Sequence, residues 1–377
     1  MTSSAPRLDS KWESKLYRSV VGLPFIGIFI WALYSLRAND MHGLGPHFAE
    51  MARTRKIQVG SVTIDMLEKF HHIKAIDDLW RLASVAFAPS TLEADPLAWW
   101  HMFSFLIDVS LLYSIWLFES TRNFSRGSLI RFPIIFGFPT QVVGIGILAP
   151  LYYYCYYIYI PSSTLLKSPE MRSIDTSYAR TIFPTVLLLS HIPIFGMYLS
   201  PSLETRHLWT WAWQMFPVWI GILGSLLTFL FPFSQQQHRR SQSQRQANIK
   251  IIRTTILAFS FISATVWLYT ALRSPYTMLE IFFPYPFDKE SFSFILVLRR
   301  VLQCDQVAAF AGSLLWLGYL VADMKRMGVV RESWLIILGA GVASVVVFGP
   351  GAAFALGWLW REEVLWRLDG GEGVKKQ

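Results

Sequence analysis

Eight stretches of the chain are apolar over roughly the length that a helix needs to cross a bilayer, and this limits the fold more than any other feature. A transmembrane helix takes about 20 predominantly apolar residues. The stretches cover residues 17–36, 97–118, 132–160, 181–200, 207–232, 254–272, 303–322 and 334–360. The chain is 53% hydrophobic and 16% aromatic, which is too apolar for a soluble globular domain. The sequence therefore predicts an all-α fold, a polytopic membrane helical bundle with about eight transmembrane helices.

Prolines make the third stretch the least regular one. Pro139 and Pro150 interrupt residues 132–160, and we expect kinks or a broken helix there, because neighbouring helices can satisfy the freed backbone groups. No cationic leader with a cleavage site opens the sequence, so we expect the first apolar stretch to be retained and to target the chain. In a eukaryotic host, this predicts an integral protein of the endoplasmic reticulum membrane.

One transmembrane domain is expected, flanked by short tails. We assign residues 1–16 to an N-terminal tail, 17–366 to a single transmembrane helical domain and 367–377 to a C-terminal tail. Residues 37–96 carry apolar side chains at helix-like spacing, namely Ile64, Leu67, Ile73, Ile76, Leu79 and Leu82. This spacing predicts an amphipathic extramembrane segment that lies against the membrane. Residues 234–253 begin with the polar sequence SQQQHRRSQSQR and are expected to form a basic loop.

The charged residues and cysteines argue against several classes of protein. The net charge is +9, but Lys and Arg lie in short clusters between apolar stretches, as they do beside membrane helices, so nucleic-acid binding is not expected. The two cysteines, Cys155 and Cys304, lie in or beside apolar stretches and are expected to be packing residues. A second group comprises His71, His72, Asp77 and Asp78. Adjacent helical residues diverge by about 100°, so neither pair converges on one ion, and no metal site is expected.

Two acids stand at the ends of apolar stretches. If all eight stretches cross the membrane, the second ends on the side from which the seventh starts, so Glu119 and Asp305 face the same leaflet. Gln141 and Gln214 then lie a few turns inside the third and fifth stretches, measured from that side. Carboxylates and amides at similar depth favour an interior polar cavity over isolated interfacial charges.

Two further polar residues lie deep within apolar stretches. Asp108 has apolar neighbours for a turn or more on each side, on the same helix face as Glu119 and about 16 Å from it. It either lines the bottom of the same cavity or bonds a neighbouring helix. His191, in the middle of the fourth stretch, is expected to bridge helices rather than to act in catalysis.

An acid in an apolar pocket indicates proton chemistry on an apolar substrate, because burial favours the protonated carboxyl group. Prenyl chemistry on a diphosphate would need an aspartate-rich DDxxD motif to bind magnesium. The sequence IDDLWR departs from that motif, since Arg81 stands where the third Asp would be. No nucleophile elbow, P-loop, iron or zinc signature or haem-type cysteine loop is present. Acid catalysis without a metal or cofactor is therefore favoured.

Five sequence motifs, in this order, resemble those of the fungal integral-membrane terpene cyclases of meroterpenoid and indole-diterpene pathways. They are WLFESTRN with Glu119, QVVGIGILAPLYYY from Gln141, WAWQMFPVW around Gln214, VLQCDQ with Asp305, and LLWLGYLVADMKRMG with Trp316. The resemblance covers about residues 97–328 and is greatest to the larger, roughly eight-span branch that includes the ascochlorin and ascofuranone cyclases.

The resemblance implies a reaction and a set of site residues. A carboxylate late in the second span and another in a late span are the expected catalytic pair, and they match Glu119 and Asp305. The implied reaction protonates a terminal epoxide on a prenyl chain and lets internal alkenes or an oxygen atom attack the carbocation. The partners are a hydrophobic prenylated substrate and membrane lipid. The expected substrate-binding residues are Arg122, Gln141, Tyr152, Gln214 and Asp108, with Arg122 orienting Glu119 or contacting a lipid phosphate.

The alternative function is a membrane transporter or a scaffold for pathway enzymes. Polar residues at membrane depth also mark permeation paths, and many transporters contain broken helices in matching halves. The broken third stretch has no evident counterpart in the second half of the sequence, which argues against transport. A scaffold would not require acids at membrane depth.

Overall fold

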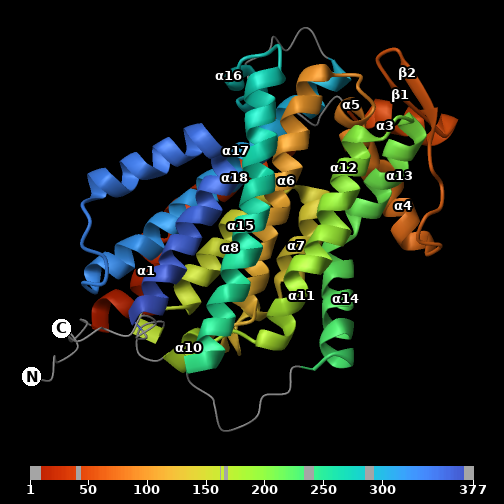
Figure 1. The fold of residues 1–377 in the computed structure, drawn as a ribbon. Helices are drawn as coiled ribbons and strands as arrows, with labels where there is room; N and C mark the ends of the chain where they lie inside the picture. Colours follow the sequence, from red (N-terminus) through yellow and green to blue (C-terminus); the bar gives the residue numbers. More distant parts are fainter. Residues whose placement is uncertain are drawn as a thin grey trace, which may run out of the picture.

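Helices make up most of the described residues, which also contain a single two-stranded sheet (Figure 1). The computed structural model describes residues 10–39, 44–161, 163–164, 169–232, 242–284 and 293–368. The predicted all-α polytopic membrane bundle is confirmed. Its long or paired apolar helices are α1 Lys15–Val21 with α2 Leu23–Leu33, α6 Pro96–Ser120, α11 Thr176–Val186 with α12 Ile192–Leu199, α13 Leu203–Gln214 with α14 Phe216–Leu230, α15 Gln242–Arg273, α17 Phe294–Arg326 and α18 Trp334–Leu368.

The bundle has two ends, which α6 and α17 define. Asp95 caps the first turn of α6 and lies 3.3 Å from Arg299, near the start of α17. Both helices therefore begin at one end, which we call the cap end, and run to the other, which we call the Glu119 end. The first helix α1 lies at the Glu119 end, where Arg18 pairs with Asp323 at 3.1 Å.

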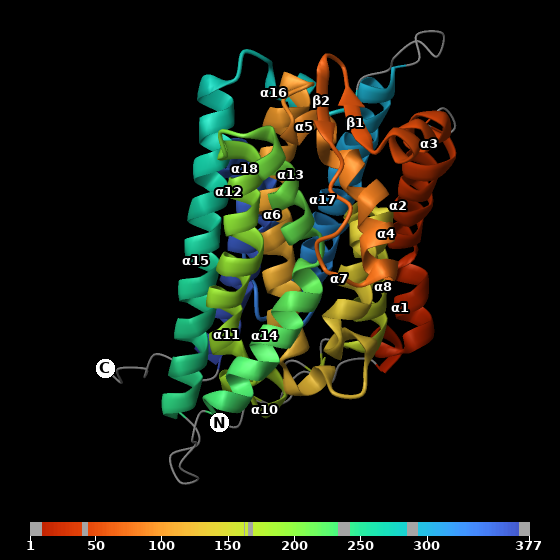
Figure 2. The same cartoon turned by 90° about the vertical axis from the view of Figure 1, so that its right-hand side faces the viewer.

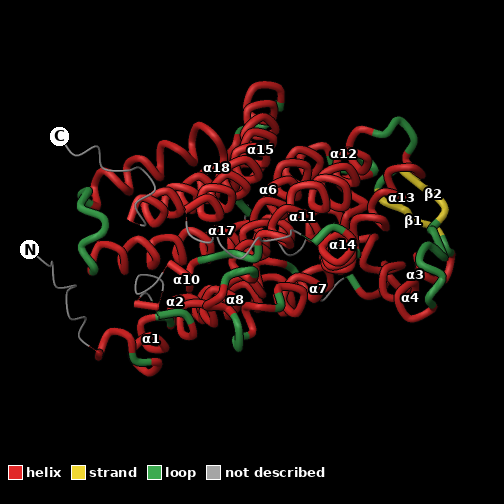
Figure 3. The backbone as a smooth tube through the Cα atoms, turned by 60° about the horizontal axis from the view of Figure 1, so that its bottom comes forward, coloured by secondary structure: helices red, strands yellow, loops and turns green. Residues whose placement is uncertain are grey.

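The helix α6 is the centre of the bundle. The apolar window of this 25-residue helix is completely buried, and in the end-on view it lies among α11, α15 and α17 (Figure 3). A helix that is apolar on all faces is stable only where other helices surround it. Side chains of α6 consequently reach several other helices, which explains why polar residues along it meet partners from distant parts of the sequence.

The third predicted stretch is a re-entrant hairpin of two short helices, α7 Pro133–Val143 and α8 Ile145–Tyr159. Arg131, just before α7, donates to the Ser120 carbonyl at the Glu119 end. At the turn, Gly146 N–H donates to Asp305. Tyr156, near the end of α8, donates to Glu119. The hairpin thus enters and leaves the bundle at the same end.

A second hairpin lies within α18, which bends at Gly349, where φ is 84°. Its first arm begins beside Lys325 at the end of α17, with the ammonium group 5.6 Å from the centroid of the Trp334 ring. Its second arm packs along α6 and brings Trp358 to Glu119. The first arm therefore begins beside the end of α17, the second arm passes Glu119, and the bend between them packs on α6, where the N–H of Gly351 donates to Asp108.

Because of these hairpins, the number of spanning segments and the sides on which the two acids lie differ from the prediction. Within the described ranges, five single helices, or seven segments when the two bent pairs are included, have the length and composition of spans, where eight were predicted. The bends within the pairs α1–α2 and α13–α14 are 47° and 60°. Because α7 and α8 turn back, α6 and α17 run in the same direction. Glu119 and Asp305 lie in opposite halves of the bundle, and the prediction that they face one leaflet is wrong.

The segment before α6 forms a small cap at its own end of the bundle (Figure 2). Its elements are η2 Tyr34–Asn39, α3 Gly45–Thr54, β1 Lys56–Val59, β2 Val62–Asp65, α4 Lys74–Ala83, η3 Ser84–Phe87 and α5 Ala88–Thr91. Ile76, Leu79 and Leu82 lie in a helix, α4, as expected. Ile64 lies instead in strand β2, in a hairpin around Gly60. The predicted basic loop is partly helical, because α15 begins at Gln242; residues 233–241 lie outside the described residues.

Candidate active site

An apolar cavity of about 450 Å³ lies where the apex of the α7–α8 hairpin meets α4, α6 and α17. Its volume is within the range of small-molecule sites, about 300–1,000 Å³. Its apolar wall includes the aromatic residues Phe48, Phe87, Phe105 and Trp213. Phe87 and Trp213 pack edge to face, with ring centroids 5.7 Å apart. Aromatic faces stabilise cations, so this wall suits a positively charged intermediate.

Asp305 is the acid of this cavity. Its side chain is buried, and Oδ1 accepts a hydrogen bond of 2.6 Å from Gly146 N–H at the start of α8. Gly144, with φ of 99°, makes the turn before α8. A Cβ atom at Gly144 would lie 2.6 Å from Asp305 Oδ1, so only glycine allows this approach. The predicted site residue Asp305 is therefore fixed in the cavity wall by the hairpin apex.

Gln141 lines the same cavity, on the last turn of α7. Its Nε2 donates to Thr140 Oγ1 at 3.3 Å, and the Thr140 hydroxyl donates to the Gly137 carbonyl at 2.6 Å. Its Oε1 is buried and has no hydrogen-bond partner among the described residues. The structure thus brings two of the predicted residues, Asp305 and Gln141, to one side of the cavity.

The sequence did not single out Arg37, which also lines the cavity. Arg37 lies in the π-helical turn η2, and its guanidinium donates to the Val142 carbonyl at the hairpin apex. π-Helical turns are frequent at functional sites. The available signal was its position at the end of the first apolar stretch. Asp78 of α4 also lines the cavity, where a hydrogen bond from Lys74 lowers the pKa of its carboxyl group and keeps it anionic.

Glu119 lies outside this cavity. The carboxylate is completely buried and accepts from Trp358 Nε1 at 2.8 Å and from Tyr156 Oη at 2.9 Å. Asp305 meets α8 at Gly146 and Glu119 meets it at Tyr156, which are about 15 Å apart along the helix. The prediction that the two acids share one pocket is wrong, because they contact α8 at points ten residues apart and Glu119 does not line the cavity of Asp305.

Two arginines and a second glutamate complete the surroundings of Glu119. Arg122 Nε lies 2.9 Å from Glu119 Oε2, and Arg361 Nη1 lies 2.9 Å from Oε1. Glu362 pairs with Arg122 at 2.7 Å and with Arg361 at 2.8 Å. We call these four residues the Glu119 cluster. Its formal charges cancel, and the expected contact of Arg122 with Glu119 is present. Arg361 and Glu362 were missed, although REE follows the last apolar stretch and could have indicated them.

Asp108 bonds neighbouring helices. Ser263 of α15 donates to its Oδ1 at 2.6 Å, and the N–H of Gly351, just after the bend of α18, donates to the same carboxyl group. Asp108 does not line the cavity of Asp305. Of the two hypotheses for this residue, the structure supports the helix contact. Asp108 and Asp305 play the same structural part, since each binds the backbone where a hairpin turns.

Three other predicted residues lie away from the cavity lining. Tyr152 is fully buried and stacks on Trp116 with ring centroids 4.3 Å apart. Gln214 is fully buried, and no described residue forms a hydrogen bond with either of its amide atoms. His191 stacks on Phe259 at 4.5 Å, which agrees with the expected packing between helices.

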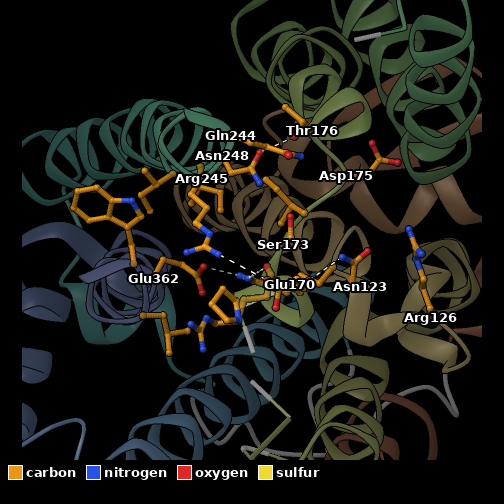
Figure 4. Close-up of a pocket in the computed structure, with 18 residues that line it drawn as sticks. Asn123, Arg126, Glu170, Ser173, Asp175, Thr176, Gln244, Arg245, Asn248 and Glu362 are labelled. Atoms are coloured by element: carbon orange, nitrogen blue, oxygen red, sulfur yellow. Dashed lines mark hydrogen bonds and ion pairs between the residues drawn. The ribbon is translucent and has the colours of Figure 1, made fainter. Parts of the chain in front are cut away.

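A second, polar cavity of about 690 Å³ opens at the Glu119 end (Figure 4). Arg122, Glu362 and Arg245 line it, and Arg245 lies 3.9 Å from Glu170. Thr176 donates to Asn248 across it at 2.7 Å. Its lining is mostly charged and polar, so it suits a prenyl chain less well than the apolar cavity does. Among the residues that the structure describes, no three His, Cys, Asp or Glu side chains gather to hold a metal ion.

The chain is similar to a known protein family and to known proteins over most of its length. The family described as the CtvD domain matches residues 21–366. Terpene cyclase ascI of Acremonium egyptiacum is 24% identical over 356 residues, which are 92% of this chain and 91% of that protein. Terpene cyclase ctvD of Aspergillus terreus is 25% identical over 260 residues, 65% of this chain and 71% of that protein.

Longer relatives match as well. FAD-dependent monooxygenase verC1 of Penicillium polonicum is 32% identical over 353 residues, which are 94% of this chain but 43% of that protein. The chain therefore spans less than half the length of this curated relative. No solved structure matches the chain.

Proposed function

This chain belongs to the CtvD domain family, and from that premise we propose that it is a membrane-bound terpene cyclase that acts on a prenylated substrate. Two relatives named terpene cyclases support the activity, and one of them matches along almost its whole length. The observation that carries the proposal is the apolar cavity, because it places the buried carboxyl group of Asp305 in the wall of a site with aromatic sides.

In the proposed reaction, Asp305 donates a proton to a terminal epoxide of the prenyl chain. The carbon–oxygen bond breaks, the oxygen atom becomes a hydroxyl group, and a tertiary carbocation forms. Internal alkenes or an oxygen atom then attack this cation in sequence while the cavity keeps water away. The Asp305 carboxylate accepts the final proton, so the product is an isomer of the substrate. Phe87, Phe105 and Trp213 stabilise the positive charge as it moves.

The longer relatives support an epoxide as the substrate. Flavin monooxygenases insert one oxygen atom from O₂, and such an enzyme converts an alkene into the epoxide that this reaction consumes. One relative that carries this activity in its name, FAD-dependent monooxygenase verC1, matches almost the whole of this chain. We place the reaction in secondary-metabolite biosynthesis at the endoplasmic reticulum membrane, with a prenylated aromatic compound as the substrate.

The separation of the two acids changes the mechanism that the sequence predicts. A shared proton between Glu119 and Asp305 requires contact, and the structure keeps them apart. We assign the initiating acid to Asp305 and give Glu119 a positioning role. The Glu119 cluster ties together α6, α8 and the second arm of α18, so it holds both hairpins in place.

The test uses microsomes that contain the wild-type protein, epoxidised farnesyl and geranylgeranyl aromatics, and no added metal. We expect products of unchanged mass and altered retention time, absent from microsomes without the protein. Microsomes that contain Glu363→Gln are the control for the loss of an acid far from the site, and they should give the same products. Glu363 lies outside both cavities and pairs with Arg253. Failure of every epoxide to isomerise in the presence of folded protein would contradict the cyclase proposal.

Transport is the second candidate function, and one observation favours it. The broken third stretch does have a counterpart, since Gly144-Ile-Gly146 and Gly349-Pro-Gly351 both form turns that meet an aspartate inside the bundle. Half-helices that begin at membrane depth are typical of transporter binding sites. Release of an unchanged terpenoid from vesicles that contain this protein, without isomerisation, would favour transport.

A further inference from the structure

Gln141 has an unused hydrogen-bond acceptor in the wall of the apolar cavity. Its Oε1 is buried and finds no partner in the part of the chain that the structure describes, although most buried polar atoms in folded proteins have one. Gln141 and Asp305 both line the cavity at the apex of the α7–α8 hairpin. An unsatisfied acceptor in the wall of an apolar site points to a ligand that supplies the missing donor.

The orientation of the amide follows from its neighbours. Thr140 uses its hydroxyl proton to donate to the Gly137 carbonyl, at 2.6 Å. The Thr140 oxygen can then only accept, and the Gln141 NH₂ group supplies that bond at 3.3 Å. The oxygen of the same amide is therefore the atom left without a partner.

We propose that Gln141 Oε1 accepts a hydrogen bond from the hydroxyl group that forms when the epoxide opens. This inference rests on the proposed function. An epoxide oxygen carries no hydrogen and cannot donate to Gln141. When Asp305 transfers its proton to that oxygen, the electron pair of the broken carbon–oxygen bond stays on oxygen, the carbon becomes a cation, and the new O–H group becomes a donor. Gln141 is then a catalytic residue that contacts the reacting oxygen.

The timing of this bond determines its effect on the kinetics. The bond is absent in the substrate complex, forms as the proton moves, and is complete in the product. An interaction that is stronger in the transition state than in the ground state raises kcat and leaves KM almost unchanged. The same interaction makes the alcohol product bind more tightly than the epoxide of the same carbon skeleton.

The experiment compares Gln141→Met with the wild type, since methionine has a similar volume and lacks the acceptor. We expect kcat to fall about tenfold, the size of one net hydrogen bond, while KM changes less than twofold. The product inhibition constant should rise by the same factor as kcat falls. Gln303→Met is the matched control, because Gln303 is also a buried glutamine but does not line the cavity. Its kcat/KM should fall by no more than its folded fraction does.

A second variant and a binding measurement keep the result independent of folding. Gln141→Asn retains the acceptor on a shorter side chain and should recover part of kcat. In thermal unfolding, the alcohol product should raise the unfolding temperature of the wild type more than the epoxide does. Gln141→Met should lose this difference. A raised KM with unchanged kcat, or equal product inhibition in both proteins, would overturn the inference. A wild-type protein that opens no epoxide would instead defeat the proposed function.

Discussion

At the scale of single residues, the structure places two of the predicted site residues in one cavity lining. Asp305 and Gln141 were expected at a site, and both line the apolar cavity. Tyr152 and Gln214 matched the same family motifs but lie outside the cavity lining, because helix rotation decides which of several neighbouring residues faces a cavity. Arg37 escaped notice because a single cation after an apolar stretch is the normal pattern of a helix leaving a membrane.

At the residue scale, the role of Glu119 is open to a direct test. Glu119→Gln leaves Arg122 and Arg361 buried with only Glu362 to balance them, and breaking a buried ion pair commonly costs about 3–5 kcal/mol. We expect a clearly lower unfolding temperature in detergent and a smaller folded fraction, with nearly normal turnover per folded molecule. Glu363→Gln, at a partly exposed pair, should change the free energy of unfolding by about 1 kcal/mol or less.

The opposite outcome is equally informative. A Glu119→Gln protein that unfolds at the wild-type temperature but no longer cyclises its substrate would return Glu119 to the chemical step. That result would show that the substrate reaches the Glu119 cluster.

At the scale of elements, the sequence predicted the helices but not their turns. Residues 132–160 are long enough for a span, and length alone cannot distinguish a crossing from a hairpin. The distinguishing feature is Gly144, whose positive φ allows the chain to reverse beside Asp305. The β-hairpin was also missed, although Ile57, Val59 and Ile64 flank Gly60 with the alternation of paired strands.

The hairpin apex makes a prediction of its own. Gly144→Ala places a methyl group 2.6 Å from Asp305 Oδ1, closer than the two atoms can approach, so we expect the carboxyl group to move and activity to fall about 100-fold, as for a misplacement of about 1 Å. Gly328→Ala is the matched control, because Gly328 also has a positive φ but nothing lies within 4 Å of its added Cβ. Turnover and unfolding temperature, measured on both variants, separate displacement of the acid from backbone strain. Equal activity losses in the two would contradict the role of the apex.

At the scale of the whole molecule, the two hairpins decide which residues share a side of the membrane. With eight crossings, the loops at Gly127 and Gly328 would lie on opposite sides. In the structure the loop at Gly127 follows the end of α6 and the loop at Gly328 follows the end of α17, so both lie at the Glu119 end. Gly60 lies between the two strands of the cap, at the other end. The sequence could not settle this, since counting apolar stretches treats every stretch as a crossing.

Cysteine labelling tests this arrangement. In a background in which Cys155 and Cys304 are replaced by alanine, single cysteines at positions 127 and 328 should react with an impermeant maleimide from the same side of sealed microsomes. A cysteine at position 60 should react from the other side. Labelling of 127 and 328 from opposite sides would restore the eight-crossing arrangement and bring Asp305 back to the side of Glu119.

The central claim is that Asp305, in the apolar cavity, supplies the proton that starts cyclisation. The most direct measurement is the single-turnover rate of Asp305→Asn with an epoxide substrate, compared with the wild type and with Glu119→Gln at equal folded concentration. Loss of general acid catalysis is commonly worth about 100- to 10,000-fold, and we predict a loss of this size for Asp305→Asn alone. A folded Asp305→Asn protein that cyclises its substrate near the wild-type rate would contradict the claim.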